Sequence, residues 1–290
     1  MLYCKAVAHH HAKDFLSAID YYCQALQKKI DFAEAFENLS EAQEEMLMFN
    51  EALISIHAAI ALKPNKYDSY IRLGRILVRL RKYDEAIKVA NNALKIEPNN
   101  PQAYMIRSNA YSGLIRLKES IDDLRLALAI KPGDTDYIYN LAFNLLLNQE
   151  FEEGWACYES RFQTKNYLNH VPNMVAPRWY GDEKIDGKRI LISPEQGIGD
   201  QIQFARYALI LKEKGASVIL AVMPQLVDIL QSMHQDIIVT SALQPANKLP
   251  AHDYYVPIMS LPGIFQANIK NIPFNERYIS PNESIAAKWR

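Results

Sequence analysis

The sequence predicts two domains of different classes: an α-solenoid of repeated helix pairs and, after it, an α/β domain with a parallel sheet. Three observations predict this order. Small, aromatic and proline positions recur at a fixed interval through the first half of the chain. The interval is lost after Gln163. From Arg189 onward, short apolar runs alternate with segments of helical periodicity, which is the pattern of βαβ units.

The composition excludes several classes of protein. The 290 residues are enough for two domains with separate cores, and a formal net charge of −1 gives no electrostatic reason to bind nucleic acid or an anionic membrane. Charged residues interrupt every apolar run before the roughly 18 residues that a membrane-spanning helix needs. No N-terminal segment has the features of a secretion signal, and neither the three cysteines nor the consecutive His9, His10 and His11 have a metal-ligand arrangement. We therefore predict a cytoplasmic protein with no metal site, no membrane span and no nucleic-acid partner.

The fixed interval is 34 residues, as between Pro64 and Pro98 and between Pro98 and Pro132. Fixed-period recurrence indicates a solenoid, because a single helix pair cannot bury its apolar face and stacked pairs share one core. Each proline cannot continue the second helix of its pair and so ends the unit. The other columns with this spacing are Ala25, Ala59, Ala93 and Ala127; Phe15, Phe49, Tyr83, Leu117 and Phe151; Ala18, Ala52, Ala86, Ser120 and Gly154; and Phe36, Tyr70, Tyr104 and Ile138.

The unit over residues 70–98 resembles the tetratricopeptide repeat at nearly every signature position, which here are Leu73, Gly74, Tyr83, Ala86, Ala93 and Pro98. We predict a repeat array over residues 1–163, with about four or five helix pairs. In the best copy the helices are expected near 68–80 and 84–96. The last unit departs from the pattern and is expected to cap the stack, with Trp155, Tyr158 and Phe162 facing the second domain.

The first helix of each repeat is expected to line an inner groove that binds a protein or peptide. One repeat supplies acidic side chains to this groove and the next supplies basic ones. Such stripes suit an extended peptide of mixed charge, although charge runs on helices are more often solvated faces, and both interpretations stay open. The predicted groove residues are Glu37, Glu41, Arg72, Arg75, Arg79 and Asn109.

Residues 164–187, which contain Pro172 and Pro177, are predicted to be a linker, and residues 188–283 a Rossmann-like half-domain. Strands alternating with helices predict a parallel sheet with right-handed crossovers. The expected strands are 189–193, 217–222, 236–240 and 253–258, and the expected helices are 200–214 and 225–232, with a short helical turn at 260–265.

A glycine turn joins the first of these strands to its helix over residues 195–200. It is not a dinucleotide fingerprint, because Ile202 stands where the third glycine should be and no acidic residue ends the second strand. It is not a Walker loop, since no Gly-Lys-Ser/Thr follows. A glycine turn lets the backbone approach a ligand, and a helix N-terminus favours negative charge.

Asp200 opens this helix and has two possible roles. It could be an N-terminal cap, or a general base at the edge of the sheet, and the two roles are compatible. The residues expected to contact substrate around it are Glu195, Gln196, Gly197, Gly199, Gln203 and Arg206.

The order of motifs closely resembles bacterial tetratricopeptide-containing glycosyltransferases, which are similar to heptosyltransferases. The resemblance rests on the repeats, on Gly154-Trp155, Arg178-Trp179 and Gly187-Lys188, and above all on the stretch 195–207. It implies half of a GT-B fold that carries the acceptor side, with Asp200 matching the catalytic aspartate. A second domain, absent from the sequence, would bind the nucleotide-sugar donor, and residues 284–290 resemble the start of the helix leading to it.

Two functions follow as expectations. In the first, the repeats bind a protein partner or acceptor, and the α/β half forms the acceptor side of a sugar-transfer site for a glycan or protein. Because a donor-binding half would have to supply the nucleotide sugar, we expect no cofactor and no turnover for this chain alone. The alternative is a non-catalytic tetratricopeptide scaffold for protein–protein interaction.

Overall fold

The structure, a computed structural model, describes residues 1–164, 176–195, 197–243, 249–273 and 277–280. The chain divides into two compact units, Met1–Asn148 and Gln149–Arg290, which we call the repeat unit and the sheet unit. The predictions for Gln196, for Pro172 and for residues 284–290 lie outside the described residues.

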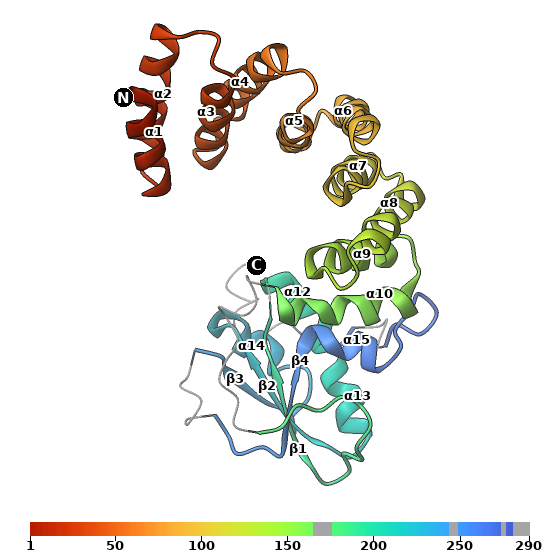
Figure 1. The fold of residues 1–290 in the computed structure, drawn as a ribbon. Helices are drawn as coiled ribbons and strands as arrows, with labels where there is room; N and C mark the ends of the chain where they lie inside the picture. Colours follow the sequence, from red (N-terminus) through yellow and green to blue (C-terminus); the bar gives the residue numbers. More distant parts are fainter. Residues whose placement is uncertain (165–175, 196, 244–248, 274–276, 281–290) are drawn as a thin grey trace, which may run out of the picture. The chain divides into compact units, whose positions relative to one another are not determined.

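The repeat unit is the predicted α-solenoid, and Figure 1 shows its helices following one another as hairpin pairs. The predicted pair at 68–80 and 84–96 is confirmed as α5 and α6, within one residue at each end. The helices are α1 (Leu2–His11), α2 (Phe15–Lys28), α3 (Ala33–Glu45), α4 (Phe49–Leu62), α5 (Tyr67–Arg79), α6 (Tyr83–Ile96), α7 (Pro101–Gly113), α8 (Leu117–Ile130) and α9 (Thr135–Leu147).

The turn inside each helix pair has the same backbone at every repeat. Lys13, Leu47, Arg81 and Ile115, which are 34 residues apart, have φ between 58° and 60°. At the first of them, the amide of Asp14 donates to the carbonyl oxygen of His9 at 2.9 Å, so the chain reverses in a Schellman-type motif. Glycine is the usual residue at this left-handed position, but here lysine, leucine, arginine and isoleucine adopt it.

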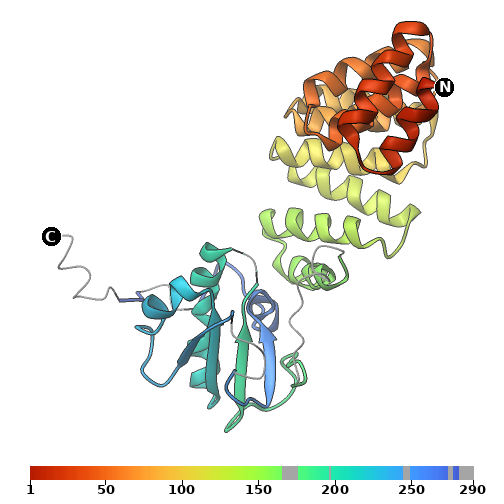
Figure 2. The ribbon, with the colours of Figure 1, turned by 90° about the vertical axis from the view of Figure 1, so that its left-hand side faces the viewer.

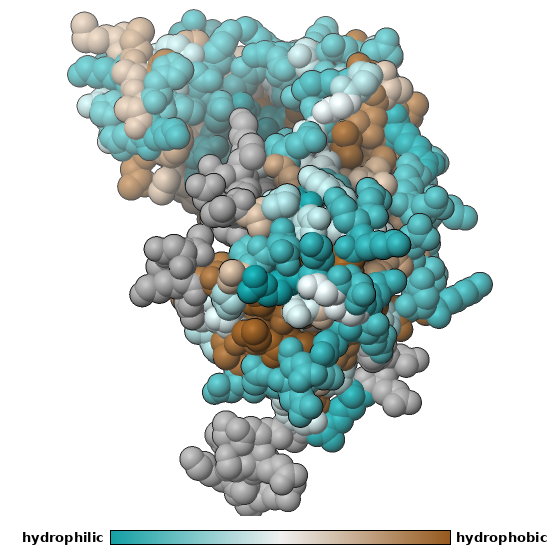
Figure 3. Space-filling model, turned by 90° about the horizontal axis from the view of Figure 1, so that it is seen from below, coloured by the Kyte–Doolittle hydropathy of each residue, from teal (hydrophilic) through white to brown (hydrophobic). Residues whose placement is uncertain are grey.

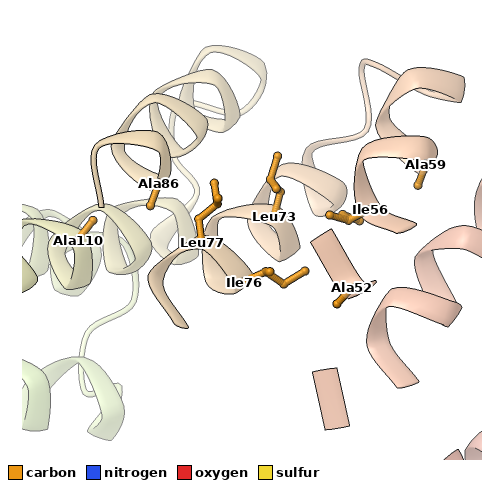
Figure 4. Close-up of a cluster of buried hydrophobic side chains, with 8 residues drawn as sticks. All are labelled: Ala52, Ile56, Ala59, Leu73, Ile76, Leu77, Ala86 and Ala110. Atoms are coloured by element: carbon orange, nitrogen blue, oxygen red, sulfur yellow. The ribbon is translucent and has the colours of Figure 1, made fainter. Parts of the chain in front are cut away.

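Small side chains let the helices approach closely. Ala52 and Ala86, from the predicted small column, are fully buried. Gly74 is required for the same reason, because a Cβ at this position would lie 2.7 Å from the Cγ2 of Ile106. Figure 4 shows the central cluster that results, with side chains from α4, α5, α6 and α7. Its members are Ala52, Ile56, Ala59, Leu73, Ile76, Leu77, Ala86 and Ala110.

The large column links successive repeats by hydrogen bonds. The hydroxyl of Tyr70 donates to the carbonyl oxygen of Pro64 at 2.8 Å. The hydroxyl of Tyr104 does the same to Pro98 at 3.2 Å. Each tyrosine therefore binds the proline that ends the preceding repeat, so these two predicted columns form one contact.

The sheet unit has the predicted parallel sheet, with strand order β3-β2-β1-β4 (Figure 2). Ile190, Leu191 and Ile192 of β1 are fully buried, as in a parallel sheet covered on both faces. The elements are α10 (Phe151–Tyr158), η1 (Glu159–Gln163), β1 (Arg189–Ser193), α12 (Ile198–Ala205), α13 (Tyr207–Glu213), β2 (Ser217–Val222), η2 (Pro224–Leu226), α14 (Val227–Leu230), β3 (Ile238–Ser241), β4 (Tyr254–Pro257), η4 (Ile258–Ser260) and α15 (Leu261–Ile264).

Three elements of the sheet unit differ from the prediction. The helix expected over 200–214 is broken at Arg206, whose Nε donates to the carbonyl oxygen of Gln203 at 2.9 Å. In an unbroken helix that oxygen would accept from the amide of Tyr207. The helix expected over 225–232 is reduced to η2 and α14. Finally, α10 and η1, which the sequence analysis assigns to the last repeat, fall in the sheet unit.

None of the helices in the described part of the chain is both long and apolar enough to cross a membrane. Hydrophilic side chains cover most of the face drawn in Figure 3, around a hydrophobic area.

Candidate functional site

Two arginines predicted to line the groove, Arg72 and Arg75, form ion pairs with glutamates of the preceding repeat. Arg72 donates to Glu41 at 3.0 Å and to Glu44 at 3.2 Å, so α5 is bound to α3. Arg75 donates to both carboxylate oxygens of Glu44, at 2.9 and 3.2 Å. Arg72 and Arg75 are therefore neutralised by Glu41 and Glu44 within the repeat unit.

Glu37 is buried, with 8 % of its surface exposed. Its carboxylate accepts from the Nζ of Lys66 at 2.6 Å and from the Oγ of Ser69 at 2.6 Å. Both donors lie at or just before the start of α5. Glu37 therefore binds one repeat to the next, and its contacts explain its presence without a partner protein.

The other two residues predicted to line the groove, Arg79 and Asn109, form no ion pair with the described residues. The guanidinium of Arg79 lies 5.9 Å from the ring centre of Phe49. Asn109 is half-buried, and its side chain makes no hydrogen bond to the described residues. Asn109 occupies the same repeat position as Glu41, Arg75 and Phe143, which are 34 residues apart, and 41 % of Phe143 is exposed. Along this column the groove changes from charged to amide to aromatic.

The repeat core holds an ion pair that was not predicted from the sequence. Arg107 donates to both oxygens of Asp123, at 2.8 and 2.6 Å, and to Asn91 at 2.6 Å. Asp123 has only 3 % of its surface exposed. A signal existed, because three other repeats hold leucine at the position of Arg107. These are Leu39, Leu73 and Leu141, so an arginine there needs a buried partner.

Arg161 fills the crevice at the carboxyl ends of β1 and β4. In an open parallel sheet, ligands bind where the strand order reverses, and here that point lies between these two strands. The side chain of Arg161, 2 % exposed, donates to Glu195 at 2.8 and 3.0 Å and to the Oγ of Ser260 at 2.6 Å. The guanidinium of Arg161 thus occupies a position that a ligand would take in such a fold.

Glu195 was predicted to contact substrate, but the structure uses it to bind Arg161. Its second oxygen also accepts from the amide of Met259 at 3.0 Å, and the residue is buried. Burial acts to lower the pKa of Arg161, but its hydrogen bonds to Glu195 and the charges of Glu195 and Glu159 raise it overall, so the guanidinium stays charged. Glu195 joins η1 to the strand ends and is not open to a ligand.

Glu159 bridges two arginines beside this crevice. It accepts from Arg161 at 2.8 Å and forms a short ion pair with Arg178. Ser260 donates to the same carboxylate at 2.8 Å. Burial acts to raise the pKa of Glu159, but the charges of Arg161 and Arg178 outweigh it and hold the pKa below its ordinary value of 4.5. Two arginines and two glutamates therefore form one balanced network.

The predicted glycine turn is on the surface. Gly197 and Gly199 are exposed, and Asp200 is half-buried. An oxygen of Asp200 accepts from the amide of Gly197 at 3.3 Å, which makes a capping interaction at the start of α12. A Cβ on Gly199 would meet no atom, so no contact within the described residues requires a glycine there.

Gln203 and Arg206 belong to a separate surface. Arg206 donates to the carbonyl oxygen of Pro273 at 3.3 Å and lies 4.6 Å from the ring centre of Tyr278. With Gln203 it lines a pocket of about 170 Å³. Asp200 does not line that pocket, so the structure divides the predicted substrate residues among three environments.

A larger pocket, of about 700 Å³, lies between α10, the segment around Arg178 and the residues that follow β4. This pocket was not among the sites predicted from the sequence. Its signal is the spacing of Phe151, Trp155 and Glu159, four residues apart on one side of α10 and its continuation. The lining is Gln149, Phe151, Glu152, Trp155, Ala156, Glu159, Arg178, Tyr180, Ser260, Gly263, Ile264, Gln266, Asn268 and Asn271.

Comparisons with known proteins support the repeat unit. The family model of the tetratricopeptide repeat matches residues 67–100, which contain α5 and α6. Protein FlbA of Caulobacter vibrioides is 29 % identical over 181 residues, which cover 60 % of this chain and 30 % of FlbA. This chain therefore matches less than a third of the length of that relative.

Among solved structures, the double mutant titled MamA RS-1 ArsTM matches 59 % of this chain and 96 % of its own, with a TM-score of 0.52 and 15 % identity. MamA from Desulfovibrio magneticus RS-1 matches 58 % of this chain and 93 % of its own, with a TM-score of 0.50 and 17 % identity. At such identities the likeness concerns the fold alone. The first unit of this chain is thus a solenoid of tetratricopeptide-type repeats.

Proposed function

We propose that the chain is a protein-interaction scaffold whose repeat unit binds an extended segment of a partner protein along α3, α5, α7 and α9. The column formed by Glu41, Arg75, Asn109 and Phe143 is the observation that carries this proposal. Stacked repeats present one side chain of this column per unit, so an extended segment can contact several in turn. The matched repeat family and the fold support it.

The chemistry of the column also indicates what the partner contributes. Glu41 and Arg75 are already engaged in ion pairs within the repeat unit, so a charged peptide gains little there. Asn109 offers an amide without a described partner, and Phe143 offers exposed ring surface. We therefore propose an uncharged segment with an amide or hydroxyl group followed by an apolar side chain.

Selection from a random peptide library on the full chain tests this. We expect enriched peptides to be uncharged and to bind with little dependence on salt, because no counterions need to be released. Asn109→Arg should weaken binding by at least about tenfold, since it places an unpaired charge in the groove. The matched control is Asn50→Arg, at an exposed position of α4, and this variant should bind peptides as the wild type does. Peptides that are mostly charged, or equal loss in both variants, would contradict the proposal.

A second candidate is the acceptor side of a sugar-transfer site, which a separate donor-binding domain would complete. Supporting it are the resemblance of the stretch 195–207 to bacterial glycosyltransferases, and the exposed glycine turn at the carboxyl edge of a parallel sheet. In this proposal Asp200 takes the proton from the acceptor hydroxyl. The chain alone would not bind a nucleotide sugar tightly, and the repeats would recruit a protein or glycan acceptor.

Asp200→Asn separates the two roles of this residue. Asparagine keeps an oxygen that can accept from the amide of Gly197, so the melting temperature should change little. Asparagine cannot act as a base, so transfer by a protein that also holds the donor-binding domain should fall by about 100-fold or more. Transfer at the wild-type rate would leave Asp200 with a capping role only.

A further inference from the structure

We propose that the 700 Å³ pocket beside α10 binds a small organic ammonium compound, with its alkyl groups against aromatic rings and its charge near Glu152. The volume falls within the range of about 300–1,000 Å³ that is usual for sites of small ligands. This proposal is independent of peptide binding in the repeat groove and of sugar transfer, so it can fail while either of those holds.

Three aromatic side chains line the pocket. Phe151 and Trp155 lie one turn apart on α10, and Tyr180 comes from the segment after η1. The indole of Trp155 is held in place, because its Nε1 donates to the carbonyl oxygen of Ala267 at 2.9 Å and its ring meets Tyr158 edge-on. Fixed aromatic faces attract alkylated ammonium groups, since the ring faces carry negative potential and the alkyl groups need no water.

The structure already uses this attraction at the same pocket. The guanidinium of Arg178 lies 4.8 Å from the ring centre of Tyr180 and 4.2 Å from that of Phe162. Tyr180 is nevertheless 61 % exposed, so much of its surface is open to a ligand. Arg178 shows that one ring of the lining, that of Tyr180, accepts a cation.

The charges of the lining favour a cation over an anion. Arg178 is neutralised by Glu159, and behind it Arg161 is neutralised by Glu195, so the four charges balance. Glu152 is exposed and makes no ion pair with the described residues. It is the one uncompensated charge among the described lining residues, and it would repel a phosphate or nucleotide.

A neutral ligand such as a sugar would use the amides of the lining but not the charge of Glu152. Two of these amides are already occupied. The Nδ2 groups of Asn268 and Asn271 both donate to the carbonyl oxygen of Gln266, at 3.3 and 3.0 Å. The exposed ring surface of Tyr180 and the carboxylate of Glu152 are thus open to a ligand.

Calorimetric titration of the full chain with choline, and with its uncharged isostere 3,3-dimethyl-1-butanol, tests the proposal. The two probes have the same shape, so a difference between them measures the charge. We expect choline to bind about tenfold more tightly. Equal affinity, no saturation by choline, or saturation by glucose at lower concentration would each overturn the proposal.

Variants locate the binding in this pocket. Glu152→Gln and Tyr180→Leu should each weaken choline binding by about three- to tenfold, with the far-UV and near-UV circular dichroism of the wild type. The matched control is Glu213→Gln on α13, an exposed glutamate that does not line the pocket. If Glu152→Gln binds choline as tightly as Glu213→Gln does, the ammonium group is not held at this pocket. Peptide binding by the repeat groove should be the same in all three variants.

Discussion

Replacing Arg161 by methionine is expected to lower the unfolding free energy of the sheet unit by about 3–5 kcal/mol. The substitution leaves the carboxylate of Glu195 buried without its counter-charge, and it removes the donors that bind η1 to Ser260 and to the carbonyl oxygen of Tyr158. A buried ion pair adds little net stability when intact, because removing two charges from water is costly. Removing one partner is far more costly, because it leaves the other charge buried alone.

The positions of the tryptophans allow this measurement. Trp155 and Trp179 lie in the sheet unit, and no tryptophan lies in the repeat unit. Tryptophan fluorescence during urea unfolding therefore reports the sheet unit through these two side chains, whereas far-UV circular dichroism reports mainly the helices of the repeat unit. Arg189→Met, at an exposed position, is the matched control and should change the free energy by less than about 0.5 kcal/mol. Adding Glu195→Met to Arg161→Met should recover part of the loss. A single variant as stable as the control would show that Glu195 is not buried as described.

In the repeat unit, Ile76→Ala is expected to cost about 2–5 kcal/mol. Ile76 is fully buried in the cluster of Figure 4, where helices on both sides hold its surroundings in place. A cavity there cannot collapse without separating neighbouring repeats. Because stability in a solenoid depends on contacts between neighbours, the loss should spread to the whole array.

Far-UV circular dichroism during urea unfolding measures this loss, and tryptophan fluorescence should show little change in the transition of the sheet unit. The matched control is Ile54→Ala on α4, where 72 % of the isoleucine is exposed, and it should change the free energy by less than about 0.5 kcal/mol. Equal stability of the two alanine variants would show that Ile76 is not packed between α5 and its neighbours as described.

The fold was predictable where a pattern is local and repeated. The columns of proline, alanine and aromatic residues predicted α5 and α6 within one residue, because each repeat imposes the same packing on the same position. The apolar run 189–193 and the run 217–222 became β1 and β2, since a buried parallel strand needs apolar side chains on both faces.

The candidate sites were less predictable, because they depend on pairings between distant residues. The groove charges were expected either to face a partner or to be solvated, but α3 and α5 bring Glu41 and Glu44 to the arginines of the next repeat. Glu195 was expected to contact a ligand, but its carboxylate forms a buried ion pair with Arg161, 34 residues earlier in the chain. No helical or strand periodicity records which charges will meet.

The solenoid of tetratricopeptide-type repeats and the parallel α/β sheet after it were predictable from the residues alone, because periodicity and apolar runs are properties of neighbouring residues. The contact of Arg161 with Ser260, 99 positions away, at the carboxyl ends of β1 and β4 depends on how the whole chain folds, and so does the place of α10 in the wall of the pocket. A buried charge needs a counter-charge from wherever the fold supplies one. Burial of apolar side chains therefore explains the elements that were predicted, and burial of charges explains the pairings that were not.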